Sequence, residues 1–303
     1  MNVVIKVNDE VKEKMIEYYK DKKRDKVIPY VVFQAKDEDT VITMYESGKV
    51  MFQGTSADVD AAMWGTILSN TKEEKEKEIK RDEKYHNCSA VGSDEVGTGD
   101  YFGPIVVTAT YVSKDNVKYL EELGIRDSKK LTDDFILKVT PEIIKKIPYR
   151  SIILTNKEYN EKYSSDLNMN KIKAIMHNKV LYQIITELKP EVDYIIVDEF
   201  AKEVRYYDYI KDAPNIQKGI TFIQKAEDKN LAVGAASIIS RYIFLKEFDK
   251  ISDEIGLPLP KGAGSNVDKV GEEVVEKYGE DKLKEIAKYN FKNTQRILKT
   301  LIF

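Results

Sequence analysis

The stretch 91–104, which reads V-G-S-D-E-V-G-T-G-D-Y-F-G-P, constrains the fold more than any other. Two adjacent carboxylates, Asp94 and Glu95, precede a Gly-x-Gly pair, and the apolar, β-branched run at 105–112 predicts a buried strand. Neighbouring residues of a flat strand point to opposite faces. We therefore expect a turn or bulge at 96–99 that lets both carboxylates converge on one point. The alternative is a solvated acidic turn.

The composition indicates a soluble chain with a substantial core. Its 303 residues allow two domains, and 42% of them are hydrophobic while 33% are charged. No run reaches the length of a membrane span and the N-terminus lacks the form of a signal peptide, so we expect a cytoplasmic protein. The single cysteine, Cys88, excludes an internal disulfide and fits a reducing compartment. With only two histidines besides, a zinc site is nearly excluded, and oxygen ligands with Mg²⁺ or Mn²⁺ are expected.

Residues 1–70 predict a small domain with the element order β-α-β-β-β-α. Such an antiparallel sheet has helices on one face and leaves its other face free for a partner. Between 12 and 26 there are seven positive residues and four negative ones, which indicates either a basic patch for phosphate or a solvated helix face. Strands are expected near 2–7, 30–35, 40–45 and 49–53, and helices near 9–24 and 57–69.

The stretch 71–86 carries six positive and six negative charges and predicts a linker. Residues 87–303 then form the second expected domain, an α/β layer around a mixed sheet. Its long helix near 170–188 carries His177, for which we expect a structural role. Strands are expected at 90–93, 105–112, 150–155, 194–198 and 221–225, and further helices at 118–123, 133–146, 232–244, 244–255 and 267–288.

Asp198 is the natural partner of the two central acids. It follows four apolar strand residues, where an unpaired charge is costly, so it needs a cation, an arginine or a changed pKa. Acids from separate strands that meet at one end of a sheet form a carboxylate cluster. Because the chain has only one cysteine and two histidines, the cluster of Asp94, Glu95 and Asp198 indicates a two-metal site with oxygen ligands for phosphoryl transfer.

Several motifs together resemble ribonuclease HIII, the bacterial relative of ribonuclease HII. The stretch D-E-V-G-T-G-D-Y-F-G-P resembles the family signature, and the resemblance covers about 87–303. The small N-terminal domain resembles the TATA-binding-protein-like domain that marks ribonuclease HIII. The other motifs follow in the family's order, namely D-S-K-K-L-T at 127–132, I-V-D-E-F at 196–200, K-A-E with A-A-S-I-I-S-R-Y at 225–242, and L-P-K-G-A at 259–263.

The resemblance implies a ribonuclease H-like fold and endonucleolytic cleavage of the RNA strand in RNA–DNA hybrids, leaving 5′-phosphate and 3′-hydroxyl ends. It implies two divalent ions, Mg²⁺ or Mn²⁺, held by Asp94, Glu95 and Asp198, and no obligatory protein partner. Single embedded ribonucleotides are expected to be poor substrates. Residues implied to contact the substrate are Gly97, Thr98 and Gly99 at ribose 2′-hydroxyls, and Ser128, Lys129, Lys130 and Lys261 near phosphates, with solvated loop lysines as the alternative.

Two positions leave the family pattern open. The fourth carboxylate is either Glu227 or Asp228. Counting eight residues back from Ala235, where A-A-S begins, favours Glu227, although Asp is the more usual side chain in ribonuclease HII relatives. Adjacent residues of an extended segment face opposite ways, so only one is expected to reach the metals. At 290 the chain has Asn290 where ribonuclease HIII proteins commonly have His, so a role for that His does not transfer.

Two other classes of function compete with a nuclease. A non-catalytic protein that binds hybrids or single strands needs the sheet and the basic patch but not the acids, and the complete acid set argues against it. A phosphate-binding-loop enzyme is disfavoured because no G-K-[ST] follows the glycines.

Overall fold

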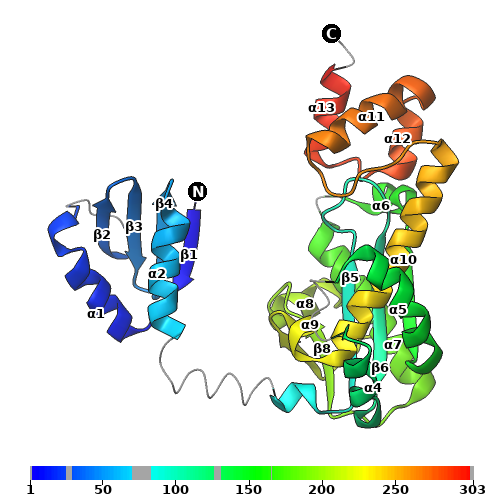
Figure 1. Cartoon of the computed structure of the whole chain (residues 1–303), viewed down its shortest axis with the longest axis horizontal. Coiled ribbons are helices and arrows are strands. Elements are labelled where there is room, and N and C mark those ends of the chain that lie inside the picture. The colour runs from blue at the N-terminus through cyan, green and yellow to red at the C-terminus, as the bar shows by residue number, and fades with distance from the viewer. Residues whose placement is uncertain (1, 25–28, 70–82, 126–130, 165, 301–303) are drawn as a thin grey trace. The chain divides into compact units, whose positions relative to one another are not determined.

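The computed structural model describes residues 2–24, 29–69, 83–125, 131–164 and 166–300, and the chain divides into two compact units, Met1–Arg81 and Asp82–Phe303 (Figure 1). Of the expected linker at 71–86, residues 71–82 lie outside the described residues. Each unit has a hydrophobic core of its own. Among the helices of the described ranges, none is long and apolar enough to cross a membrane.

The N-terminal unit is a four-stranded antiparallel sheet with two helices, in the element order predicted from the sequence. The strands lie in the order β1-β4-β3-β2, and Ile42, Met44 and Phe52 on one face pack against the helices. Trp64 donates its indole N–H to the buried Tyr19 hydroxyl at 3.0 Å, which joins the two helical segments. The elements are β1 (Asn2–Lys6), α1 (Asp9–Tyr18), η1 (Lys20–Lys22), β2 (Val31–Asp37), β3 (Thr40–Tyr45), β4 (Lys49–Gly54) and α2 (Ala57–Ser69).

The second face of this sheet carries no helix among the described residues and is partly polar. Side chains alternate between the two faces along each strand. Ile5 and Phe52 point into the core, so the residues next to them in sequence lie on the second face. There Lys6 pairs directly with Lys49 across β1 and β4, and both side chains are exposed. Lys36 at the other edge is exposed as well.

The C-terminal unit contains a five-stranded mixed sheet in the order β7-β6-β5-β8-β9, which confirms the expected fold class. The β5–β6 and β6–β7 pairs are antiparallel, and the β5–β8 and β8–β9 pairs are parallel. The central strand β5 therefore meets antiparallel β6 on one side and parallel β8 on the other. The strands are β5 (Ala90–Val96), β6 (Ile105–Val112), β7 (Tyr149–Leu154), β8 (Tyr194–Asp198) and β9 (Ile220–Ile223).

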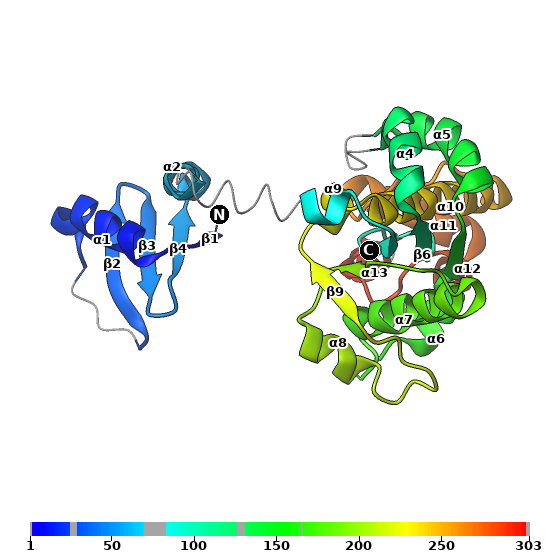
Figure 2. The ribbon, with the colours of Figure 1, turned by 90° about the horizontal axis from the view of Figure 1, so that it is seen from below.

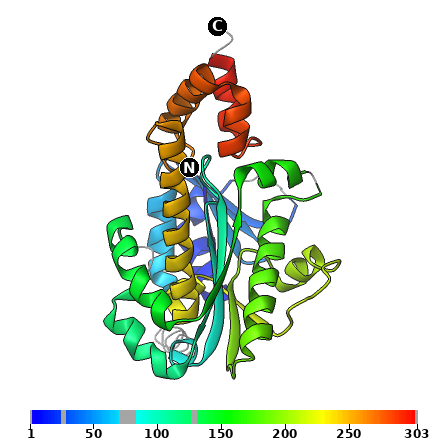
Figure 3. The same cartoon turned by 90° about the vertical axis from the view of Figure 1, so that its right-hand side faces the viewer.

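Helices cover both faces of this sheet, as Figures 2 and 3 show, with α10 and α5 on one face and α7 on the other. The expected helices at 232–244 and 244–255 are one helix, α10, which ends at Gly256 in the left-handed conformation. The expected helix at 267–288 is broken into α11 and α12 at Gly279, whose φ is +82°. The described helices are η2 (Lys114–Asn116), α4 (Val117–Glu122), α5 (Asp133–Lys146), α6 (Asn156–Lys162), α7 (Met169–Leu188), α8 (Glu203–Tyr209), α9 (Ala226–Lys229), α10 (Leu231–Ile255), α11 (Ser265–Tyr278), α12 (Glu280–Ile286) and α13 (Lys292–Thr300).

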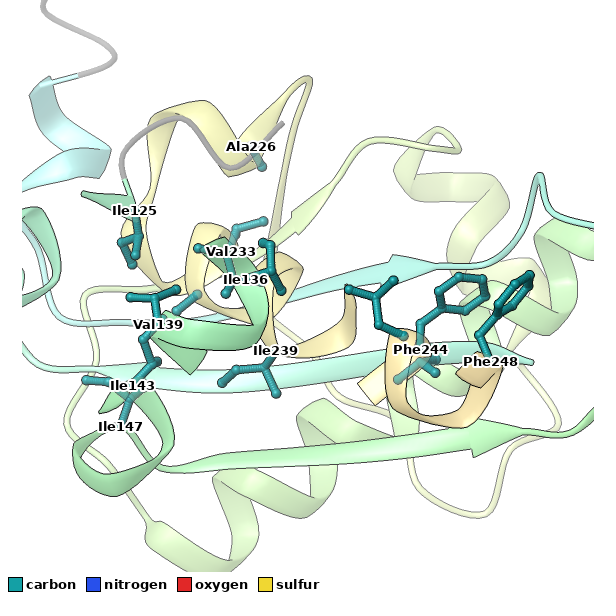
Figure 4. Packing of buried hydrophobic residues seen from close by; sticks show 14 of the residues in the cluster. Ile125, Ile136, Val139, Ile143, Ile147, Ala226, Val233, Ile239, Phe244 and Phe248 are labelled. Carbon is teal, nitrogen blue, oxygen red and sulfur yellow. The ribbon is translucent and has the colours of Figure 1, made fainter. Parts of the chain in front are cut away.

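Alternation along the strands divides the core into two layers. Ala90, Val106 and Ile196 belong to the layer under α5 and α10, part of which Figure 4 shows. Their neighbours in sequence, such as Val91, belong to the layer under α7. At Gly92 a Cβ would lie 2.4 Å from the backbone nitrogen of Val233, so glycine is what lets α10 lie directly against β5.

Candidate active site

The acids predicted from the sequence come from the ends of two neighbouring strands and the turn after a third. Asp94 and Glu95 are in the last part of β5, and Asp198 is the last residue of β8. Ser93 pairs in parallel with Val197, so Asp94 and Asp198 follow at the same end of the sheet. The backbone N–H of Ala226 donates to Asp198 Oδ1 at 3.0 Å and brings α9, with its acids, to this edge.

No bulge interrupts β5 at Asp94 and Glu95, so their side chains leave the strand in opposite directions, and their convergence on one metal site stays a prediction. The ladder between β5 and β6 stays regular through Val96, so adjacent residues keep opposite directions. Asp94 accepts a hydrogen bond from Ser237 of α10. Glu95 lies 2.5 Å from Lys173 Nζ and 2.9 Å from His177 Nε2, both on α7. The turn at 98–99 begins only after the β5–β6 ladder has ended at Val96, beyond both acids.

Asp94 lies among negative charges on the α10 side. Burial, together with the charges of Glu95 and Glu227, raises the pKa of the Asp94 carboxyl to about 8. Glu227 is only 5% exposed, whereas Asp228 is exposed. Of the two candidates for the fourth acid, Glu227 is therefore the one that the structure buries near Asp94.

Glu95 has positive partners instead. Burial by itself raises the pKa of the Glu95 carboxyl, but the hydrogen bonds and charges of His177 and Lys173 outweigh it and hold that pKa at about 2. His177 is fully buried and its Nδ1 lies 2.8 Å from the Ser93 hydroxyl. Lys173 and its contact with Glu95 were missed from the sequence. The available signal was the i,i+4 spacing of Lys173 and His177, which puts both on one face of a helix.

The donor set suits a hard divalent cation. Asp94, Asp198 and Glu227 supply only oxygen. Burial and nearby like charges raise the pKa of Asp94, and a bound cation would stabilise its ionised form. Within the described ranges, however, no group of three His, Cys, Asp or Glu side chains is arranged to hold a metal ion as it stands. One reason is that both oxygens of Glu95 already face cationic or hydrogen-bonding groups of α7.

The glycines of the central stretch have different functions. Gly97 has a φ of +88°, and a Cβ there would lie 2.1 Å from the Pro104 carbonyl oxygen, so this position requires glycine for folding. Gly99 is exposed, and a Cβ there would meet no described atom within 4 Å. Thr98, between them, is partly buried. Of the two glycines, Gly99 alone accepts a Cβ without a clash with a described atom.

The C-terminal segment holds the loop that follows these glycines. Lys288 is fully buried, and its Nζ donates to the carbonyls of Asp100 at 2.8 Å and Gly103 at 2.7 Å. Burial lowers the pKa of the Lys288 ammonium to about 7. Gly262 N donates to Asp100 Oδ1 at 2.6 Å, and Tyr101 N donates to Gly262 O at 2.8 Å. The glycine-rich loop is thus fastened to residues that are far away in sequence.

Of the residues expected near phosphates, the structure describes only one. Ser128, Lys129 and Lys130 lie outside the described residues. Lys261 forms an ion pair with Asp133 at the start of α5, and Arg241 Nε donates to the same carboxylate at 2.9 Å. The structure therefore gives Lys261 an intramolecular partner.

Asn290, which replaces the family's usual His, has a structural contact. Its Oδ1 accepts a hydrogen bond from the buried Tyr159 hydroxyl at 2.9 Å. Asn290 therefore helps to join the last loop of the chain to α6.

The chain is similar to known proteins over its whole length. It matches the family profile described as "Ribonuclease HII" over residues 91–294 and that described as "Domain of unknown function (DUF3378)" over residues 2–77. It is 38% identical to ribonuclease HIII of Bacillus cereus and 40% identical to that of Lysinibacillus sphaericus, each alignment covering 99% of both chains. The crystal structure of Bst-RNase HIII in complex with Mn²⁺ superimposes with a TM-score of 0.70 at 36% identity, over 99% of each chain.

The same relatives match both units of the chain. The C-terminal unit provides the ribonuclease H-like sheet with its acids, and the same relatives also cover the N-terminal unit. The resemblance read from the motifs is confirmed. The chain belongs to the ribonuclease HIII family, hydrolases that cleave the RNA strand of RNA–DNA hybrids.

Proposed function

We propose that this chain cleaves RNA–DNA hybrids by metal-assisted hydrolysis at the edge formed by β5, β8 and α9, leaving 5′-phosphate and 3′-hydroxyl ends. The observation that carries the proposal is the gathering of Asp94, Asp198 and Glu227 on the α10 side of the sheet, where burial and, after it, acidic neighbours raise the pKa of Asp94. We assign these three and Glu95 as the ligands of Mg²⁺ or Mn²⁺. The Mn²⁺ complex of Bst-RNase HIII supports a divalent ion as the cofactor.

The bound ions would activate water and stabilise the leaving 3′ oxygen. The chain's own residues position the reactants. Asp198 Oδ1 accepts a hydrogen bond from the Ala226 N–H, which fixes this carboxylate at the end of β8. Asp94 is fixed through its backbone carbonyl, which accepts from the Ser240 hydroxyl at 3.1 Å. Asp94 is therefore fastened to α10, and Asp198 to α9.

We assign the backbone of Gly97, Thr98 and Gly99 to the recognition of ribose 2′-hydroxyls, the groups that distinguish RNA from DNA. Support comes from the exposed position of Gly99, where no described side chain obstructs the approach of a ligand. The Lys288 contacts with Asp100 and Gly103 keep the adjoining loop in place. Lys261, Ser128, Lys129 and Lys130 are assigned to phosphate contact on the family motifs alone.

We assign hybrid binding to the free face of the N-terminal sheet, within residues 1–70. Two lysines directly opposite each other on neighbouring strands, Lys6 and Lys49, repel and weaken a sheet. A phosphate between them would remove that repulsion, which supports a role in binding a polyanion. The proposal requires no protein partner. It places the enzyme in the cytoplasm, since hybrids form where DNA is copied and the lone Cys88 fits a reducing compartment.

The test is cleavage of an RNA strand labelled at its 5′ end and paired with DNA. Duplex RNA, duplex DNA and a DNA duplex with one ribonucleotide serve as comparison substrates. We expect cleavage of the hybrid that needs Mg²⁺ or Mn²⁺ and stops with a chelator, 3′-hydroxyl products that a polymerase extends, and weak activity on the single ribonucleotide. Tight binding of the hybrid without cleavage at any metal concentration would instead identify a non-catalytic binding protein.

A further inference from the structure

The contact between Lys173 and Glu95 is an ion pair inside the candidate active site. Lys173 Nζ lies 2.5 Å from Glu95 Oε1, and the two side chains are 11% and 12% exposed. Breaking a pair this well buried leaves one charge without compensation, which costs far more than breaking a surface pair. The pair is thus a determinant of where the Glu95 carboxylate lies.

The surroundings of Lys173 keep its ammonium at this place. The ammonium lies 4.1 Å from the centre of the Phe200 ring, which favours a cation there. The same ring stacks on His177, with ring centres 5.4 Å apart. His177 in turn contacts Glu95 Oε2 at 2.9 Å and the Ser93 hydroxyl at 2.8 Å. One face of α7, together with Phe200 after β8, therefore forms a cradle for the Glu95 carboxylate.

The cradle gives Glu95 a charge environment different from that of Asp94. Asp94 has acidic neighbours and Ser237 as a hydrogen-bond donor, while Glu95 has a lysine in direct contact. The protein thus supplies an internal cation to one of the two adjacent acids. A divalent ion that uses Glu95 Oε1 must share that oxygen with the lysine or displace it.

We propose that Lys173 is a positioning residue that acts as the built-in counter-ion of Glu95 and competes with the divalent cation for it. This inference rests on the proposed function, because it takes Glu95 to be a metal ligand. Lys173 stabilises the metal-free protein, and it weakens metal binding, since like charges repel at short range. Removing Lys173 should therefore lower the stability of the metal-free protein and raise its affinity for the divalent cation.

The experiment titrates Mn²⁺ into the full chain without nucleic acid, by calorimetry, for the wild type and for Lys173→Met. We expect the variant to bind Mn²⁺ roughly tenfold more tightly, the change that about 1.4 kcal/mol produces. The matched control is Lys179→Met, an exposed lysine on the same helix that changes the net charge equally. Its affinity should be that of the wild type. Equal or weaker Mn²⁺ binding by Lys173→Met overturns the proposal, and misfolding cannot mimic a gain in affinity.

A second measurement covers the case in which Lys173→Met is too unstable to titrate. Thermal unfolding in the presence of a chelator should give a lower Tm for Lys173→Met than for wild type, and the double variant Lys173→Met/Glu95→Gln should recover most of the loss. No recovery means that Lys173 acts by packing alone and contradicts the proposal. If Mn²⁺ binding changes as expected while hybrids are not cleaved, the proposed function fails and the counter-ion role remains.

Discussion

The backbone N–H of Ala226 lies 3.0 Å from Asp198 Oδ1, and this hydrogen bond anchors the single turn α9 to the end of β8. Because Glu227 is the next residue, the bond places its backbone beside the end of β8. Glu227 is buried within the electrostatic reach of Asp94, while Asp228 is exposed. Motif counting and burial therefore favour the same residue as the fourth acid.

The first prediction compares the two members of this pair. Glu227→Gln should lower the cleavage rate of hybrid by on the order of 100-fold or more, since it removes a charged oxygen ligand. Asp228→Asn, the matched control, should keep most of the activity because its side chain is exposed. Rates are measured on labelled hybrid at saturating Mg²⁺. The opposite ranking would assign the role to Asp228.

The second prediction concerns Asp94 in the metal-free protein. Its folded pKa, about 8, lies above the ordinary value of 3.8, so the folded state binds more protons and loses stability as the pH rises from about 4 to 8. Asp94→Asn should abolish cleavage and also remove this loss. Chemical denaturation with a chelator at pH 5 and pH 8 checks it. An Asp94→Asn variant that loses as much stability over this range as the wild type would refute the electrostatic argument.

The third prediction uses Gly99. A Cβ there meets no described atom, so Gly99→Ala should leave the Tm nearly unchanged while it lowers hybrid cleavage, by roughly tenfold or more if the backbone approaches the ribose. Gly97→Ala is the contrasting variant, because its φ of +88° and the Pro104 carbonyl make any side chain disruptive. Wild-type cleavage by Gly99→Ala would show that the ribose is read elsewhere.

The fourth prediction concerns the buried lysine behind the glycine loop. The Lys288 pKa of about 7 lies below the ordinary value of 10.5, so the unfolded state binds more protons and this lysine adds stability as the pH rises from 7 towards 10. Lys288→Met should lose that gain, on the order of a few kcal/mol. Denaturant titrations at pH 7 and pH 9.5 measure it, with the exposed Lys292→Met as control. Parallel pH profiles for wild type and Lys288→Met would contradict a buried titrating ammonium.

The fifth prediction separates affinity from chemistry. Because the chain divides at residue 81 into two units with separate cores, deletion of residues 1–81 should leave a folded catalytic unit. We expect KM for hybrid to rise roughly tenfold at low salt with little change in kcat. The difference should shrink as salt increases, since lysine–phosphate contacts release counterions. A KM that is unchanged at every salt concentration would remove the N-terminal sheet from substrate binding.

Much of the architecture could be read from local patterns. The element order of the N-terminal unit follows from alternating apolar residues and turn signals, and the runs at 105–112 and 194–198 predict strands because β-branched residues pack on a pleated surface. The helix near 170–188 is equally clear from its apolar spacing. The ends of the helices were predicted less well. Gly279 divides one expected helix, and α10 spans two expected helices. Tertiary packing overrides weak local signals at such positions.

The sequence alone predicted which residues carry the chemistry: the adjacent Asp94 and Glu95, the strand-end Asp198 and the pair at 227 and 228. Only the tertiary structure decided what each of them faces. Strand alternation in a regular ladder sends Asp94 towards α10 and Glu95 towards Lys173 of α7. A motif records neighbours along the chain, whereas the charge state and direction of a buried carboxylate depend on groups that folding brings from elements far away in sequence.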